Sequence, residues 1–197
     1  VACDALWRVG LPREELAGLA AELGSDVAFA LVGGTAIGSG RGERITAALT
    51  RGTYHWVLVP SPDGLATPEV YAEFDRRTSA GPNPDPAAAD AVLQALLSDD
   101  APALGRSLSN DLQEAACAIR PDLADLLSLG AACGALGGLV SGSGPTVAFL
   151  VRDNEHALDL SVGLAASGAC ALVKRVSGPV PGARLFQAPQ VVQPTSH

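Results

Sequence analysis

A single carboxylate, Asp26, lies between a Gly-Ser step and an apolar run in the sequence LGSDVAFALVGG, residues 23–34. A charge that enters an apolar region is costly unless it is hydrogen-bonded or paired. One interpretation is structural: Ser25 or Asp26 caps a short helix that begins near Val27. The other is chemical, because an aspartate at the edge of a dry cleft can orient a hydroxyl or accept its proton during phosphoryl transfer. The two interpretations are compatible, since a cap can hold a base in place.

Two further segments combine glycine with hydroxyl side chains. The first is SGSGPT, residues 141–146, whose backbone N–H groups could cradle a phosphate. Familiar phosphate loops run from a strand into a helix, whereas here an apolar strand follows and no Lys follows the glycines. A tight hairpin turn is therefore the structural alternative. The second is DGLATPEVY, residues 63–71, which a turn and a helix cap at Thr67 already explain; substrate contact by Thr67 would be an addition.

The remaining pattern predicts alternating helices and strands around these segments. Two helices are expected before residue 24, the second with Leu16, Leu19 and Leu23 on one apolar face. Two short strands with a glycine-rich turn follow within residues 35–47. The other expected helices cover residues 67–77, 87–97, 101–119, 121–133 and 153–166, and the other expected strands lie at 54–60, 135–140, 146–151 and 170–176.

One polar segment is placed inside a predicted helix. SNDLQ, residues 109–113, falls in the middle of the helix expected at 101–119, where Asn and Asp are mildly unfavourable. These side chains are expected to face solvent. Without the inserted helices, residues 54–176 read strand, helix, strand, strand, helix, strand. That order is the split βαβ, ferredoxin-like arrangement, with helices on one face of an antiparallel sheet.

Composition limits the classes of partner. The chain has 197 residues, of which 48% are hydrophobic and 17% charged, as in a globular protein with a sizeable core. Its 13 Lys and Arg against 21 Asp and Glu give a net charge of -8. This balance argues against nucleic acid or an anionic membrane as the main partner, because both require a basic surface.

Cysteine usage and hydropathy point to a cytoplasmic protein without a metal centre made of Cys and His. The four cysteines form no CxxC pair, and the three histidines complete no zinc pattern. We expect free thiols in a reducing compartment. The uncharged stretch 126–150 is long enough for a membrane span, but its glycines and proline favour two or three short soluble elements.

The order of four segments is more specific than any one of them. They are LGSDVAFALVGGTAIGSGRGE, PDGLATPEVYAEFD, SNDLQEAA and GALGGLVSGSGPTVAFLV. In this order they resemble the GHMP kinase superfamily, and within it the 4-diphosphocytidyl-2-C-methyl-D-erythritol kinases, over about residues 7–181. The resemblance implies an α+β GHMP kinase fold. Residues 1–52 would be the C-terminal part of the N-terminal, ATP-binding domain, residues 53–187 a ferredoxin-like C-terminal domain, and residues 188–197 a tail.

The resemblance also implies a reaction and a catalytic aspartate. These kinases transfer the γ-phosphate of ATP, with Mg²⁺, to the 2-hydroxyl of a cytidine-diphosphate-linked methylerythritol, in the non-mevalonate route to isoprenoids. Their G-[AS]-D-V-P-F motif carries the catalytic aspartate and matches Asp26. The resemblance therefore favours the catalytic interpretation of Asp26 over the cap alone.

Two other motifs are carried over by the same resemblance. The family's Gly-Ser-Gly loop matches Gly142, Ser143 and Gly144, which are expected to border the reaction centre. Its G-V-S-T-P-E-V-F-like segment matches Gly64, Thr67 and Pro68 on the substrate side.

The chain also departs from the family pattern. Ala28 replaces the proline that usually follows Asp-Val, and Ala66 stands where serine is common. The family's N-terminal lysine, its cytosine-recognising residues and its Gly-Leu-Gly-Gly-Gly-Ser-Ser phosphate loop precede the helix that VACDALW matches. None of these is in this sequence, so we expect an N-terminally truncated piece that is inactive or nearly so by itself.

Two alternatives remain beside this interpretation. Another GHMP kinase, of the homoserine or mevalonate type, would keep the Gly-Ser-Gly loop but is not expected to match the segment from GSDVAF to GRGE. A non-catalytic ferredoxin-like binding module predicts that replacing Asp26 causes no loss of binding.

Overall fold

The computed structural model describes residues 1–78 and 86–186, and the chain divides into two compact units. Unit 1 comprises residues 1–48 together with residues 179–186, and unit 2 comprises residues 49–178.

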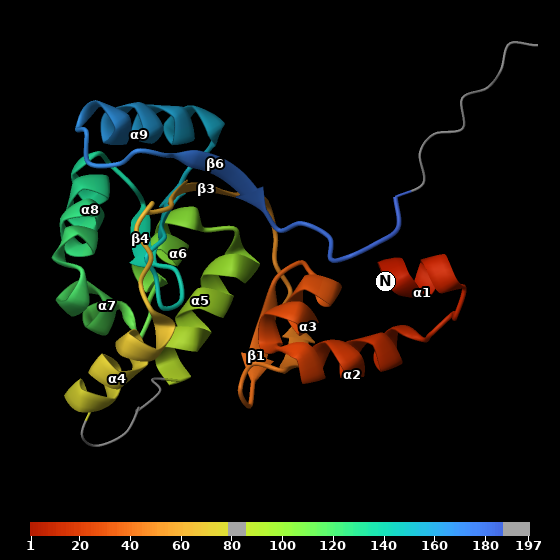
Figure 1. Ribbon diagram of the computed structural model, residues 1–197. Coiled ribbons are helices and arrows are strands. Elements are labelled where there is room, and N and C mark those ends of the chain that lie inside the picture. Colours follow the sequence, from red (N-terminus) through yellow and green to blue (C-terminus); the bar gives the residue numbers. More distant parts are fainter. Residues whose placement is uncertain (79–85, 187–197) are drawn as a thin grey trace, which may run out of the picture. The chain divides into compact units, whose positions relative to one another are not determined.

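Unit 1 contains three helices and a two-stranded hairpin, drawn in red and orange in Figure 1. The strands β1 and β2 pair antiparallel, with Ala36 opposite Ala47. The turn between them takes positive φ at Gly40 and Gly42, as glycine readily does. The predicted strands and glycine-rich turn are confirmed. The elements are α1 (Ala2–Trp7), α2 (Arg13–Leu23), α3 (Ser25–Val32), β1 (Ala36–Ser39) and β2 (Arg44–Ala47).

The core of unit 1 is small. Ala20 of α2 packs with Ala28 and Leu31 of α3, and Leu16 covers this cluster. The other two leucines of the expected apolar face, Leu19 and Leu23, are 51% and 79% exposed, so only part of that face is buried. Within the described residues, α2 and α3 meet through Ala20, Ala28 and Leu31.

Residues 179–186 belong to unit 1, whereas the family resemblance implied a second domain over residues 53–187. Gly34 N–H donates to Val180 C=O at 2.8 Å, and Ala183 N–H donates to Ala30 C=O at 2.9 Å. The backbone at Gly33 has φ 67° and touches Gly182, so a side chain at Gly33 would collide with the returning chain. This pairing joins the end of α3 to residues 180–183.

Unit 2 is built on a four-stranded sheet in the order β4-β5-β3-β6, with every neighbouring pair antiparallel. Two strand-helix-strand units whose strands interleave give this order, which confirms the ferredoxin-like arrangement. The strands are β3 (Tyr54–Val59), β4 (Gly137–Val140), β5 (Val147–Val151) and β6 (Lys174–Gly178).

Helices cover both faces of this sheet. Successive residues of a strand point to opposite faces, and Phe149 and Leu150 of β5 belong to two different buried clusters. Phe149 packs with residues of α4, α7, α8 and α9, whereas Leu150 packs with residues of α5 and α6. The expectation that the two helices of the ferredoxin-like core, α4 and α9, lie on one face is confirmed, whereas the inserted helices α5 and α6 cover the other face. The helices are α4 (Thr67–Arg77), α5 (Pro86–Ser98), α6 (Ala101–Ser107), α7 (Gln113–Ile119), α8 (Pro121–Ala132) and α9 (Asn154–Ala166).

The single helix predicted over residues 101–119 is two helices, α6 and α7, with a break at 108–112. The Asn110 side chain causes a local turn there, because its Oδ1 accepts from Leu112 N–H at 3.1 Å. Such Asn turns compete with helical hydrogen bonding. The helical spacing of the leucines continues through the break, so hydrophobic periodicity alone could not reveal it.

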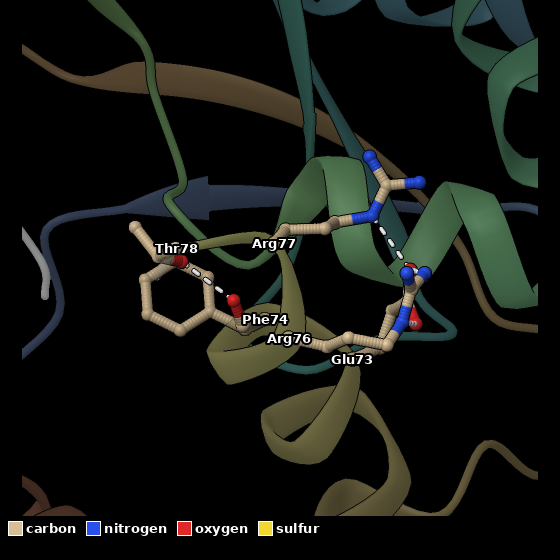
Figure 2. A network of polar contacts seen from close by, with 5 residues as sticks. All are labelled: Glu73, Phe74, Arg76, Arg77 and Thr78. Carbon is tan, nitrogen blue, oxygen red and sulfur yellow. Dashed lines mark hydrogen bonds and ion pairs between the residues drawn. The ribbon is translucent and has the colours of Figure 1, made fainter. Parts of the chain in front are cut away.

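The last turns of α4 carry a polar network, shown in Figure 2. Both Arg76 and Arg77 contact one carboxylate oxygen of Glu73 at 2.6 Å. Hydrogen bonds from these guanidinium groups hold the pKa of Glu73 below its usual value. The hydroxyl of Thr78 donates to Phe74 C=O and closes the helix end.

Candidate active site

Asp26 lies in the first turn of α3 and is exposed. The helix begins at Ser25, its N-cap is Gly24, and no side chain caps it. The interpretation of Ser25 or Asp26 as a helix cap is therefore wrong. The Asp26 carboxylate is not committed to a cap, and the first turn is where the helix dipole favours an anion.

A depression of about 330 Å³ in unit 1 has Asp26 in its lining. The glycine-rich hairpin contributes to the lining and packs closely on the start of α3, because a side chain at Gly42 would meet the Ser25 Cβ at 3.0 Å. Glycine at this position thus lets the hairpin backbone approach Ser25, the residue before the aspartate. The lining residues are Ser25, Asp26, Phe29, Ala36, Gly38, Gly42 and Ile45.

In unit 2, the SGSGPT segment forms the turn between β4 and β5. Ser141 N–H donates to Thr146 C=O at 2.8 Å, and Gly144 N–H donates to Ser141 C=O at 3.0 Å. Gly142 and Gly144 have φ of 58° and 85°, a region that favours glycine. The hairpin interpretation of this segment is confirmed.

Thr67 and Ser143 are in direct contact within unit 2. Their hydroxyl oxygens are 2.8 Å apart, and either can donate. The prediction that Thr67 caps its helix is wrong, because α4 begins at Thr67 itself and Ala66 is the N-cap without a side-chain bond. Thr67 therefore uses its hydroxyl toward the turn rather than toward its own helix.

The structure brings two of the three sequence-predicted segments together. Leu65 lies against the turn, because a side chain added at Gly144 would meet a Leu65 methyl at 3.4 Å. Pro68 occupies the first turn of α4, as the sequence indicated. A Cβ added at Gly64 would meet no atom within 4 Å, and φ there is not positive. The backbone at this position therefore does not require glycine. Asp26 belongs to unit 1.

Asn110 and Gln113 are the residues that the sequence reasoning missed. The Asn110 Nδ2 donates to Val140 C=O at 2.7 Å and to Gly142 C=O at 2.8 Å. Gln113 Oε1 accepts from Val140 N–H at 3.0 Å. The expectation that the polar residues of SNDLQ face solvent is therefore wrong for these two. The signal in the sequence was the position of polar residues in the middle of a predicted helix, where they are unfavourable unless their side chains bond elsewhere.

An open depression of about 480 Å³ in unit 2 is lined by residues 71, 74 and 109–112. Tyr71 is 52% exposed, so one aromatic ring is available to a ligand there.

A different cavity, of about 560 Å³, is lined in part by Arg120, which donates to both carboxylate oxygens of Asp122 at 2.8 and 2.7 Å. This pairing lowers the pKa of Asp122. The Arg120 guanidinium is therefore already paired with a carboxylate of the same chain.

Metal-ligand and membrane signatures are not found in the described part of the chain. Within residues 1–78 and 86–186, no group of three or more His, Cys, Asp or Glu side chains could hold a metal ion. All four cysteines are free, as predicted, and burial raises the pKa of Cys117 and Cys170. No described helix has the length and apolar character needed to cross a bilayer.

Comparison with known proteins identifies the family. The family model described as "GHMP kinases C terminal" matches residues 92–170. The 4-diphosphocytidyl-2-C-methyl-D-erythritol kinase of Thermobifida fusca is 56% identical over 184 residues, which are 93% of this chain and 59% of that protein. The kinase of the same name from Leifsonia xyli is 53% identical, over 94% of this chain and 62% of its own length. This chain belongs to the GHMP kinases.

Solved GHMP kinases share the fold. A crystal structure of 4-(cytidine 5'-diphospho)-2C-methyl-D-erythritol kinase superposes with a TM-score of 0.69 at 28% identity, covering 92% of this chain and 62% of the other. The homoserine kinase of Cytophaga hutchinsonii superposes with a TM-score of 0.65 at 19% identity, over 89% and 60% of the two chains, which shows the fold alone. The chain spans about 60% of the length of the curated GHMP kinases it matches.

Proposed function

We propose that this chain takes part in the phosphorylation of the 2-hydroxyl of 4-diphosphocytidyl-2-C-methyl-D-erythritol by ATP. The observation that carries the proposal is the identity of 50–56% to kinases of that name over almost the entire chain. Structural likeness to homoserine kinases is limited to the fold. The proposed reaction places the protein in isoprenoid precursor synthesis by the non-mevalonate route, and in the cytoplasm.

Asp26 is the proposed catalytic residue. Its carboxylate is exposed at a depression and caps no helix, so it is available to accept a hydrogen bond or a proton from a substrate hydroxyl. Loose transition states for phosphoryl transfer require little proton removal, and orientation of the hydroxyl is then the larger part of the role.

Gly142, Ser143 and Gly144 form the proposed phosphate-binding turn. Gly142 and Gly144 have positive φ, and turns of this kind can present backbone N–H groups to an anion. Because Gly144 N–H already donates to Ser141 C=O, the N–H groups of Gly142 and Ser143 are the proposed anion donors. Thr67, with Pro68 and Gly64, is proposed to contact the substrate. The Thr67 hydroxyl is exposed and lies beside the Ser143 hydroxyl, so one polar group of a ligand could contact both.

Mg²⁺ is proposed to enter with ATP. Mg²⁺ usually binds through nucleotide phosphates and one or two carboxylates rather than in an all-protein site. Bound with ATP, it would neutralise charge on the nucleotide phosphates. The protein side chains described above then bind and orient the acceptor.

The proposal is tested by ADP release with MgATP and three acceptors: the diphosphocytidyl substrate, homoserine and mevalonate. The assay is run on the complete gene product and on the 197-residue chain. We expect turnover of the first acceptor only by the complete gene product, and little or none by the chain. Turnover of homoserine or mevalonate instead would favour another GHMP kinase. Acceptor binding without turnover by the complete gene product would favour a non-catalytic module.

A further inference from the structure

Two amide side chains, of Asn110 and Gln113, bond to the end of β4, and one of them also bonds to the turn at residues 141–144. Val140 is the last residue of β4, an edge strand of the sheet of unit 2. Its C=O accepts from Asn110 and its N–H donates to Gln113. Asn110 also reaches two residues further, to Gly142 C=O inside the turn. The first two bonds close a strand edge, but the third has no such explanation.

We propose that Asn110 is a positioning residue that fixes the Gly-Ser-Gly turn for anion binding. The inference rests on the proposed function of that turn. Asn110 holds the turn at the Gly142 carbonyl, and Thr67 meets it at the Ser143 hydroxyl. The turn is thus held on both sides, which keeps its N–H groups oriented before a phosphate arrives. Donors that are already oriented cost no rearrangement during the reaction.

The chemistry of Asn110 fits positioning rather than ligand contact. Both of its Nδ2 hydrogens point to carbonyl oxygens, and its Oδ1 accepts from Leu112 N–H. The flipped amide would place oxygen against two oxygens, so the orientation is determined by the partners. No side-chain donor of Asn110 is left for a substrate.

Replacing the amide by an acid should have a large effect at Asn110 and a small one at Gln113. Asn110→Asp keeps the acceptor for Leu112 N–H but replaces the donor with an anion facing two carbonyls. Gln113→Glu keeps the oxygen that accepts from Val140 N–H. If Asn110 merely shaped the break between α6 and α7, Asp would serve as well, because aspartate forms the same local turn. Asn154→Asp is the matched control, since Asn154 is an exposed residue of α9 in the same unit.

The first readout is amide hydrogen exchange in the 197-residue chain. In Asn110→Asp we expect exchange at Ser141 and Gly144 to accelerate about 10- to 100-fold, the range for losing two hydrogen bonds of ordinary net strength. Gln113→Glu and Asn154→Asp should change it less than about threefold. Unchanged exchange in Asn110→Asp would overturn the proposal. Equal acceleration throughout β3 and β5 would also overturn it, because the residue would then support the whole unit.

The second readout is the kinetics of the complete gene product. Asn110→Asp should lower kcat by about tenfold or more, with KM for the acceptor changed less than about threefold, since misplaced donors affect the transition state more than binding. A normal kcat in Asn110→Asp, beside an active wild type, would contradict the positioning role. A wild type inactive on all three acceptors would refute the proposed function, while the exchange data would still decide whether Asn110 holds the turn.

Discussion

The hydroxyl groups of Thr67 and Ser143 are 2.8 Å apart although 76 residues separate them in sequence. The contact joins the start of α4 to the turn between β4 and β5. The sequence indicates each residue for a separate reason: Thr67 as a helix cap and Ser143 as part of a glycine-rich turn. Their contact makes one polar surface from two segments of unit 2.

A double-mutant cycle measures this contact. Thr67→Val and Ser143→Ala each remove a hydroxyl, and Val nearly preserves the shape of Thr. We expect a coupling free energy of about 0.5 kcal/mol, the low end for a hydrogen bond, because Thr67 is exposed. The measurement is urea unfolding of the four proteins. Strictly additive effects would show that the two hydroxyls do not interact in solution.

Gly144→Ala tests whether the turn requires glycine. Gly144 has φ 85°, and a Cβ there would lie 3.0 Å from a Val140 methyl. We expect a loss of about 1–3 kcal/mol in the free energy of unfolding. Gly64→Ala is the control, with an expected change within about 0.5 kcal/mol, because open space surrounds that position. Equal losses at both positions would contradict this account of the turn.

Glu73 predicts a pH dependence of stability. Arg76 and Arg77 hold its pKa in the folded protein below the ordinary carboxyl value of 4.5. Its contribution is therefore present above pH 4.5 and is lost as the pH falls through the folded pKa. Glu73→Gln should flatten the dependence of unfolding free energy on pH below 4.5, an effect that salt weakens. Asp75→Asn controls for loss of one negative charge on the same helix, and an equal flattening there would exclude the ion pairs as the cause.

Much of unit 2 could be predicted from the sequence because its strands are short, apolar and bounded by turn residues. The strand order and the inward residues Ala157, Leu160 and Leu164 of α9 follow from such patterns, and the structure confirms them. The GHMP kinase family was likewise predictable from the order of four motifs.

Two of the errors share one physical origin, namely side chains with two competing partners. Thr67 could bond its own helix or a distant hydroxyl, and Asn110 could face solvent or two distant carbonyls. Local sequence describes only the first option in each case. The covering of both sheet faces was missed for a related reason: α5 and α6 are apolar, but nothing local tells which face they cover.

The central claim is tested most directly by Asp26→Asn in the complete gene product, assayed with MgATP and 4-diphosphocytidyl-2-C-methyl-D-erythritol. Asparagine keeps the size of the side chain but cannot accept the hydroxyl proton, so kcat should fall about 10²- to 10⁴-fold. The free energy of unfolding should change by at most about 1 kcal/mol, because the carboxylate caps no helix. Glu22→Gln, an exposed change on α2, should leave both quantities unaltered. An active wild type whose kcat is insensitive to Asp26→Asn would contradict the catalytic role of Asp26.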